Sequence, residues 1–295
     1  MATTQDVGAD RRAGPPAPAA PRARRSRFDA LLLIPALLLI LGVVGYPFVV
    51  SVIDSFVKVE GRQHAYAWIT ANPVYLRIIG RTFLTSVVAV VLCVLLAYPY
   101  AYVMVLAGRR IRLVLTVAVL VPFWVSGLVR TFAWVILLQS GGPVDRLLPF
   151  LGRDGLLHTQ TAVLVGLVQV LLPFMILPLY NSMQSIDRRL LQAAESLGAR
   201  QTVAFFRVVV PLSAPGAGAG ALLVFVTSLG IYVLAQILGS PATSMIGSVV
   251  YTQTSQLNNT GRAAALSLSM LAGAVVLIGA AYLLFRLVPG ARRAG

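Results

Sequence analysis

The stretch QAAESLGARQTVAFFRVVVP, residues 192–211, places polar and charged side chains inside a chain that is otherwise strongly apolar. It holds Glu195, Arg200 and Arg207, and two small residues, Ala193 and Ala194, lie directly before Glu195. Small side chains let another surface approach a helix backbone closely. The residue types therefore leave two interpretations open: a docking element for a partner protein, or an amphipathic linker that lies on the membrane surface.

The same region carries helix start and stop signals. Ser185 can cap a helix, and Asp187 suits the positive end of the helix dipole. Apolar residues recur every three to four positions, at Ile186, Leu190, Ala193 or Ala194, and Leu197, which predicts one apolar stripe. Gly198 is predicted to end this helix, because glycine adopts the left-handed conformation at least cost. A second short helix is predicted over residues 201–209, and Pro211 is expected to stop it.

The chain lacks the residues that catalysis or metal binding would need. A phosphate-cradling loop requires a Gly-Lys-Ser/Thr sequence, but the only lysine is Lys58, which Val59 follows. The single cysteine, Cys93, lies in an apolar run, and His64 and His158 have no second ligand at metal spacing. We therefore expect no enzyme activity, no metal site and no cofactor in this chain.

One charge and several aromatic residues fall within predicted membrane spans. Arg130 either lines a translocation path or pairs with a partner, or it extends its charge outward along its apolar stem. Four aromatic residues are further candidates to line a translocation path: Trp124, Trp134, Tyr98 and Tyr102. They could stack on a cation, although packing and interface positions are the commoner use of such residues.

Composition places the elements that hold these residues in a membrane. The 295 residues are 58% hydrophobic and 11% charged, with a mean hydropathy of +0.85. Because a helix needs about 20 apolar residues to cross a bilayer, we predict an all-α protein with six transmembrane helices. The predicted spans are 30–54, 82–106, 114–138, 161–180, 214–238 and 263–287. Gly216, Gly218 and Gly220 at the start of the fifth predict close helix packing.

The basic residues indicate the orientation of the spans. Arginine supplies 23 of the 24 basic residues, and most of these arginines flank apolar segments, so the net charge of +15 reflects topology and not nucleic-acid binding. With the N-terminus inside, 15 basic residues lie on the inner side and 7 on the outer side. Both termini are thus predicted to be cytoplasmic. Residues 1–27 are expected to form a disordered basic tail, 28–288 the six-span domain, and 289–295 a second tail.

The segment 192–211 resembles the EAA motif of binding-protein-dependent ABC importer permeases, E-A-A-x-x-x-G-x(9)-I-x-L-P. Gln192 stands at the Glu position, Ala193, Ala194 and Gly198 match, Val208 and Val210 replace Ile and Leu, and Pro211 matches. The leading Glu is lost, and Glu195, three residues on, is a possible electrostatic substitute. Residues 122–152 and 238–253 are also similar to the first permease subunit of spermidine/putrescine importers.

The resemblance implies a fold, partners and a role. It implies a type I ABC importer permease of the bacterial inner membrane, whose helices at about 185–211 couple to a cytoplasmic ATPase dimer that binds ATP and Mg. It further implies a second permease chain of different sequence, an extracytoplasmic substrate-binding protein, surrounding membrane lipid and a polyamine substrate. Importers of ferric iron, opines or amino-acid-like compounds are alternatives. A stand-alone secondary transporter would need inverted repeats and buried ionisable groups, and a membrane-embedded enzyme would need a catalytic cluster.

Overall fold

A computed structural model describes residues 35, 38–56, 65–147 and 155–287, and all their regular structure is helical, which confirms the all-α prediction. The chain divides into two units, Met1–Val49 and Val50–Gly295. The described part of the first unit contains η1 (Leu41–Gly45) and the start of α2 (Tyr46–Phe56), which belong to one apolar helix, Leu38–Phe56. The predicted tails, 1–27 and 289–295, lie outside the described residues.

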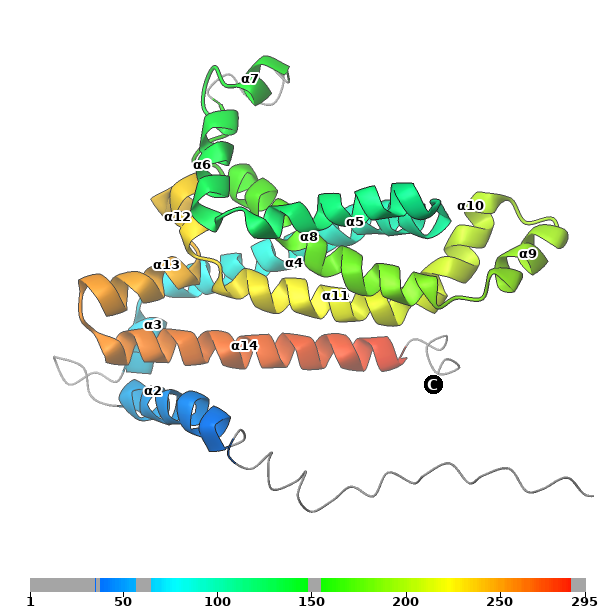
Figure 1. Cartoon of the computed structure of the whole chain (residues 1–295). Coiled ribbons are helices and arrows are strands. Elements are labelled where there is room, and N and C mark those ends of the chain that lie inside the picture. Colours follow the sequence, from blue (N-terminus) through cyan, green and yellow to red (C-terminus); the bar gives the residue numbers. More distant parts are fainter. Residues whose placement is uncertain (1–34, 36–37, 57–64, 148–154, 288–295) are drawn as a thin grey trace, which may run out of the picture. The chain divides into compact units, whose positions relative to one another are not determined.

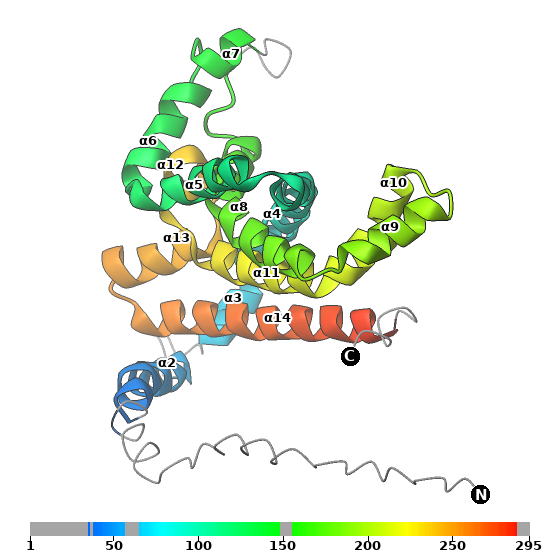
Figure 2. The same ribbon diagram turned by 45° about the vertical axis from the view of Figure 1, so that its right-hand side comes forward.

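Three long helices form the centre of the second unit. α4 (Pro73–Leu106), α8 (Gln160–Gln184) and α11 (Val210–Gly230) pack against one another along their lengths (Figures 1 and 2). The axis of α14 (Thr260–Leu287) is roughly parallel to the axes of these three helices. α14 contacts mainly α3 (Ala65–Ala71) and α13 (Ile246–Tyr251). α9 (Arg188–Ser196) and α10 (Gln201–Ala204) lie at one end of these helices and α13 at the other, which we call the α9 end and the α13 end.

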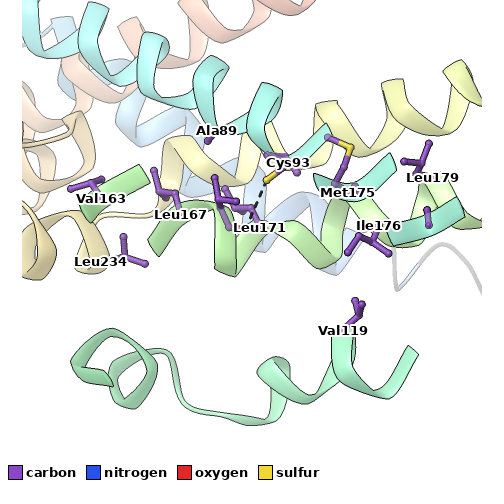
Figure 3. Close-up of a cluster of buried hydrophobic side chains, with 14 of the residues drawn as sticks. Ala89, Cys93, Val119, Val163, Leu167, Leu171, Met175, Ile176, Leu179 and Leu234 are labelled. Carbon is purple, nitrogen blue, oxygen red and sulfur yellow. Dashed lines mark hydrogen bonds between the residues drawn. The ribbon is translucent and has the colours of Figure 1, made fainter. Parts of the chain in front are cut away.

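In the core between α4 and α8, small side chains of α4 pack against large side chains of α8 (Figure 3). A residue every fourth position along α4 is fully buried, namely Ala89, Cys93, Ala97 and Ala101. The facing side chains of α8 are larger and also buried: Leu167, Leu171, Met175, Ile176 and Leu179. The Cys93 thiol donates a weak hydrogen bond to the Val168 carbonyl oxygen at 3.9 Å. Small residues on one helix allow the close approach on which packing in membranes depends.

Glycines bring α11 equally close to α8. A Cβ atom on Gly216 would lie 2.3 Å from the Cβ of Ser182, and one on Gly220 would lie 2.7 Å from the Sδ of Met175. A Cβ on Gly218 would meet nothing within 4 Å. The predicted close packing is therefore confirmed for Gly216 and Gly220, but it was wrong for Gly218, which lies on a different face of the helix.

The third predicted span, 114–138, is not one continuous helix. α5 (Arg109–Trp124) and α6 (Gly127–Leu138) meet at an angle of 101°. Val125 and Ser126 between them have extended backbone angles, with ψ of 130° and 137°. Pro122 has no backbone N–H to donate within a helix, and Gly127 has low helix propensity. The helix is therefore broken here, although the hydropathy of the segment is continuously high. The described residues thus hold five candidate spanning helices, or six if the bent pair counts as one span.

Two other span boundaries also differ from the prediction. The fifth span, predicted to reach 238, ends at Gly230, where Ile231 turns to an extended conformation, and α12 (Val233–Leu238) is a separate short helix. The second span begins at Pro73, nine residues before the predicted start at 82. Proline at the first helical turn needs no donor there and favours a helix start. The remaining elements include η4 (Pro241–Thr243), η5 (Thr252–Gln256) and α7 (Pro143–Leu147).

A polar cluster fixes the connection between α12 and α13 onto α4. The guanidinium of Arg81 donates to the carbonyl oxygens of Ala242 and Ser244. The backbone N–H of Ile246 donates to the Thr82 hydroxyl at 3.0 Å. These contacts pair polar groups that would otherwise lack partners in apolar surroundings, and they hold the α13 end of the bundle together.

Candidate functional site

The first helix of the 185–211 element is capped by Asp187 and not by Ser185. In α9 (Arg188–Ser196) the Asp187 Oδ1 accepts a hydrogen bond from the Arg189 N–H at 2.9 Å, so Asp187 is the N-cap. Ser185 instead ends α8 in a helical conformation, and its hydroxyl donates to the Ser182 carbonyl oxygen at 2.7 Å. The predicted Ser185 cap was wrong, because an N-cap needs the extended backbone that Asp187 has.

Gly198 ends α9 as predicted. Its φ is +85°, in the left-handed region. The N–H of Ala199 donates to the Ala194 carbonyl oxygen at 3.0 Å, and the N–H of Gly198 donates to that of Glu195 at 2.9 Å. These two bonds form a Schellman motif, which satisfies the last carbonyl groups of the helix. The motif produces the sharp turn between α9 and the helix that follows.

The second helix does not stop at Pro211. α10 (Gln201–Ala204) leads into a π-helical turn, η3 (Phe205–Val209), and then directly into α11, so that one helix runs from Gln201 to Gly230. The predicted stop was wrong. The π turn lies just before Pro211, and such turns change the hydrogen-bond register, so the missing donor of a proline is tolerated there.

The surface of α9 is largely open. Gln192, Ala193 and Glu195 are exposed, and Ala194 is half-buried. The predicted apolar stripe does not face the bundle throughout, since Leu190 is 48% and Leu197 is 89% exposed. Within residues 186–197, Ile186 and Leu191 pack against the core. The element therefore presents apolar side chains outward, as a docking surface would.

A small cavity separates α9 from the ends of α4 and α8. It has a volume of about 180 Å³. Its lining includes Tyr102, Met183, Leu191, Gln192, Glu195 and Val209. Gln192 and Glu195 thus border the same space although only Gln192 stands at a motif position. Val208 is half-buried and Pro211 is exposed on the continuous helix beyond the cavity.

Tyr98 and Tyr102 face the 185–211 element. The Phe205 ring lies edge-on to Tyr102 at 4.8 Å between centroids and to Tyr98 at 6.2 Å. The sequence pattern identified the two tyrosines but missed Phe205, although the Phe205–Phe206 pair lies within the motif segment 192–211 and was a visible signal. A role for the tyrosines in the translocation path stays a prediction.

The other three path candidates do not share one helix. Trp124 is the last residue of α5 and 89% exposed, whereas Arg130 and Trp134 belong to α6. Arg130 is half-buried, and its Nη2 donates to the Val125 carbonyl oxygen at 3.4 Å. The Trp134 indole donates to Gln169 Oε1 at 3.5 Å and packs against the core. The structure therefore places two of the three in contacts within the chain.

Comparison with known proteins identifies relatives of this chain. Residues 94–289 match the family described as "Binding-protein-dependent transport system inner membrane component". The chain is 32% identical over 242 residues to the spermidine/putrescine transport system permease protein PotB of Salmonella typhimurium (strain SL1344), covering 80% of this chain and 84% of the relative. The PotB of Escherichia coli (strain K12) is 31% identical, with 80% of this chain and 88% of that protein covered.

A solved structure has the same fold. The chain is similar to a component of a bacterial ABC transporter involved in the import of the acidic polysaccharide alginate, with a TM-score of 0.71 and 18% identity. The match covers 90% of this chain and 97% of that chain. At this level of identity the likeness concerns the fold alone.

Proposed function

This chain belongs to the binding-protein-dependent transport system inner membrane components, and on that premise we propose that it carries polyamines of the spermidine/putrescine type. It is a permease subunit of an ABC importer, a transport protein of the inner membrane. The observation that carries the substrate proposal is the 31–32% identity, over four-fifths of the chain, to permeases named for spermidine and putrescine.

The 185–211 element is proposed to dock a cytoplasmic ATPase. Support comes from the exposed Leu190 and Leu197, and from the tight turn at Gly198 between α9 and the long helix that begins at Gln201. ATP and Mg bind to the ATPase dimer, whose closure moves this element and reopens the spans toward the other face. The contact residues are those of the motif: Gln192, Ala193, Ala194, Glu195, Gly198, Val208 and Pro211.

The orientation and the remaining partners follow from the same proposal. The α9 end is cytoplasmic, with both termini on that side, as the excess of arginine in the inner segments indicates. A second permease chain completes the translocation path, and an extracytoplasmic binding protein delivers substrate at the α13 end. The alternative of a transporter that works alone is not favoured, because the chain belongs to an importer family.

Reconstitution tests these proposals in two steps. We would tag the chain, extract it gently from its native membrane and identify the copurifying proteins by mass spectrometry. An ATPase with a phosphate loop, a second permease and a binding protein are expected. The complex would then be placed in liposomes with labelled spermidine, and uptake should require ATP. Recovery of the chain alone, active without ATP, would overturn the importer mechanism, whereas ATP-dependent uptake of another solute would overturn only the substrate.

A further inference from the structure

The junction between α10 and α11 holds one aromatic side chain against α4. Phe205 is the first residue of the π turn η3, and its ring is half-buried. Tyr98 and Tyr102, which lie four residues apart on α4, meet this ring from the same helix face, both with edge geometry at 88° and 68°. Phe205 thereby joins the 185–211 element to a spanning helix remote in sequence.

Phe205 and α9 have different surroundings. Phe205 has the two tyrosine rings beside it, and the buried Val209 lies four residues on. α9 borders the cavity of about 180 Å³, whose lining includes Tyr102 and Val209 but not Phe205. The Tyr102 hydroxyl is buried and makes no hydrogen bond to the described residues. α9 therefore has space to shift against the bundle, whereas Phe205 is held.

Two routes lead from the 185–211 element into the spans. One is covalent, because the helix Gln201–Gly230 passes without interruption into α11. The other route runs from the 185–211 element to α4, through the contact of the Phe205 ring with the two tyrosine rings. A core that is close-packed transmits displacement through such contacts.

We propose that Phe205 is a positioning residue of transport, through which displacement of the 185–211 element is passed to α4 by way of Tyr98 and Tyr102. The inference rests on the proposed function, since it assumes that an ATPase moves this element. Without the ring, α4 loses its contact with η3 and follows the element only through its packing against α11. ATP hydrolysis then continues while substrate movement fails.

The test uses the complete complex of both permeases, ATPase and binding protein in liposomes. The measured quantity is labelled spermidine taken up per ATP hydrolysed. For Phe205→Ala we expect this ratio to fall about three- to thirtyfold, with hydrolysis within about twofold of the native complex. Phe205→Tyr, which keeps the ring, should restore the ratio. Phe206→Ala is the matched control, because Phe206 is the adjacent residue, 68% exposed, and contacts Phe205 without a ring contact to α4.

A distance measurement separates lost coupling from lost folding. Spin labels at Val103 on α4 and Leu212 on α11, both exposed, report whether the helices move together after Cys93→Ala removes the native thiol. The distance should stay constant on ATP binding in the native complex and change in Phe205→Ala. An unchanged uptake ratio, or the same distance response in both complexes, would overturn the inference. Absence of ATP-dependent uptake in the native complex would instead overturn the proposed function.

Discussion

The Nη2 of Arg130 lies 3.4 Å from the carbonyl oxygen of Val125, on the other side of the break between α5 and α6. Val125 is the C-cap of α5, where the helix dipole presents its negative end. The positively charged guanidinium of Arg130, which belongs to α6, thus offsets the negative dipole end of α5. This contact gives Arg130 a local function at the 101° bend, which the sequence alone did not suggest.

Removal of that charge should loosen the bend. For Arg130→Gln we expect a loss of about 0.5–1.5 kcal/mol of unfolding free energy, the range of a modest hydrogen bond with a helix-end charge. Thermal unfolding of the purified complex in lipid discs would measure it. Arg146→Gln on the exposed short helix α7 should have little effect. Equal stability of the Arg130 variant and the native chain would show that the contact contributes nothing.

Substitutions of Gly198 should follow backbone preference and not size. Its φ is +85° and a Cβ there would meet nothing within 4 Å, so the cost of a side chain arises from conformation. Left-handed backbone costs an ordinary residue about 1–2 kcal/mol and asparagine less. Uptake and ATPase copurification should therefore decline in the order Gly, Asn, Ala, Val. A fully active Gly198→Val variant would argue against the turn as a necessary element.

The glycines of α11 offer a comparison within one helix. Gly216→Ala and Gly220→Ala place a methyl group 2.3–2.7 Å from atoms of α8, and overpacking of this kind costs about 1–3 kcal/mol. Gly218→Ala fills open space and should be neutral or slightly stabilising, since alanine favours helix. Thermal unfolding of the three variants is the measurement. Equal losses at all three positions would contradict the packing described here.

Asp187 and Ser185 should differ in their effect on α9. Asp187→Ala removes the N-cap and should destabilise the helix by about 0.5–2 kcal/mol. Ser185→Ala removes only a bond to the Ser182 carbonyl oxygen at the end of α8. Hydrogen exchange of residues 188–196 should therefore accelerate in the first variant and stay near native in the second. Faster exchange in both variants to the same degree would restore Ser185 as a capping residue.

The sequence predicted what depends on composition and on local chemistry. Apolar length located the spans, and glycine at 198 located the end of α9, because both signals act within a few residues. Breaks inside apolar runs were not predictable in this way. Hydropathy is the same whether Val125 is helical or extended, and at Gly230–Ile231 it is equally uninformative.

Contacts between remote segments were beyond sequence reasoning. Tyr98 and Tyr102 were selected for their aromatic character, but only the packing of α4 beside η3 shows that they meet Phe205. Pro211 was read as a helix stop because proline lacks a donor, while the π turn that accommodates it depends on the tertiary path of the chain. Arg81 lies one residue before the predicted second span at 82–106, whereas it belongs to α4, which begins at Pro73.

The unbroken helix from Gln201 to Gly230 spans 30 residues, a length of about 45 Å. In the proposed orientation it forms a lever with one end at the cytoplasmic surface and the other at the opposite face of the bilayer. Tilting such a lever moves its two ends in opposite directions without any change in its own hydrogen bonds. The extended residue Ile231 is then the hinge beyond which the α12–α13 connection, anchored on α4, can remain in place.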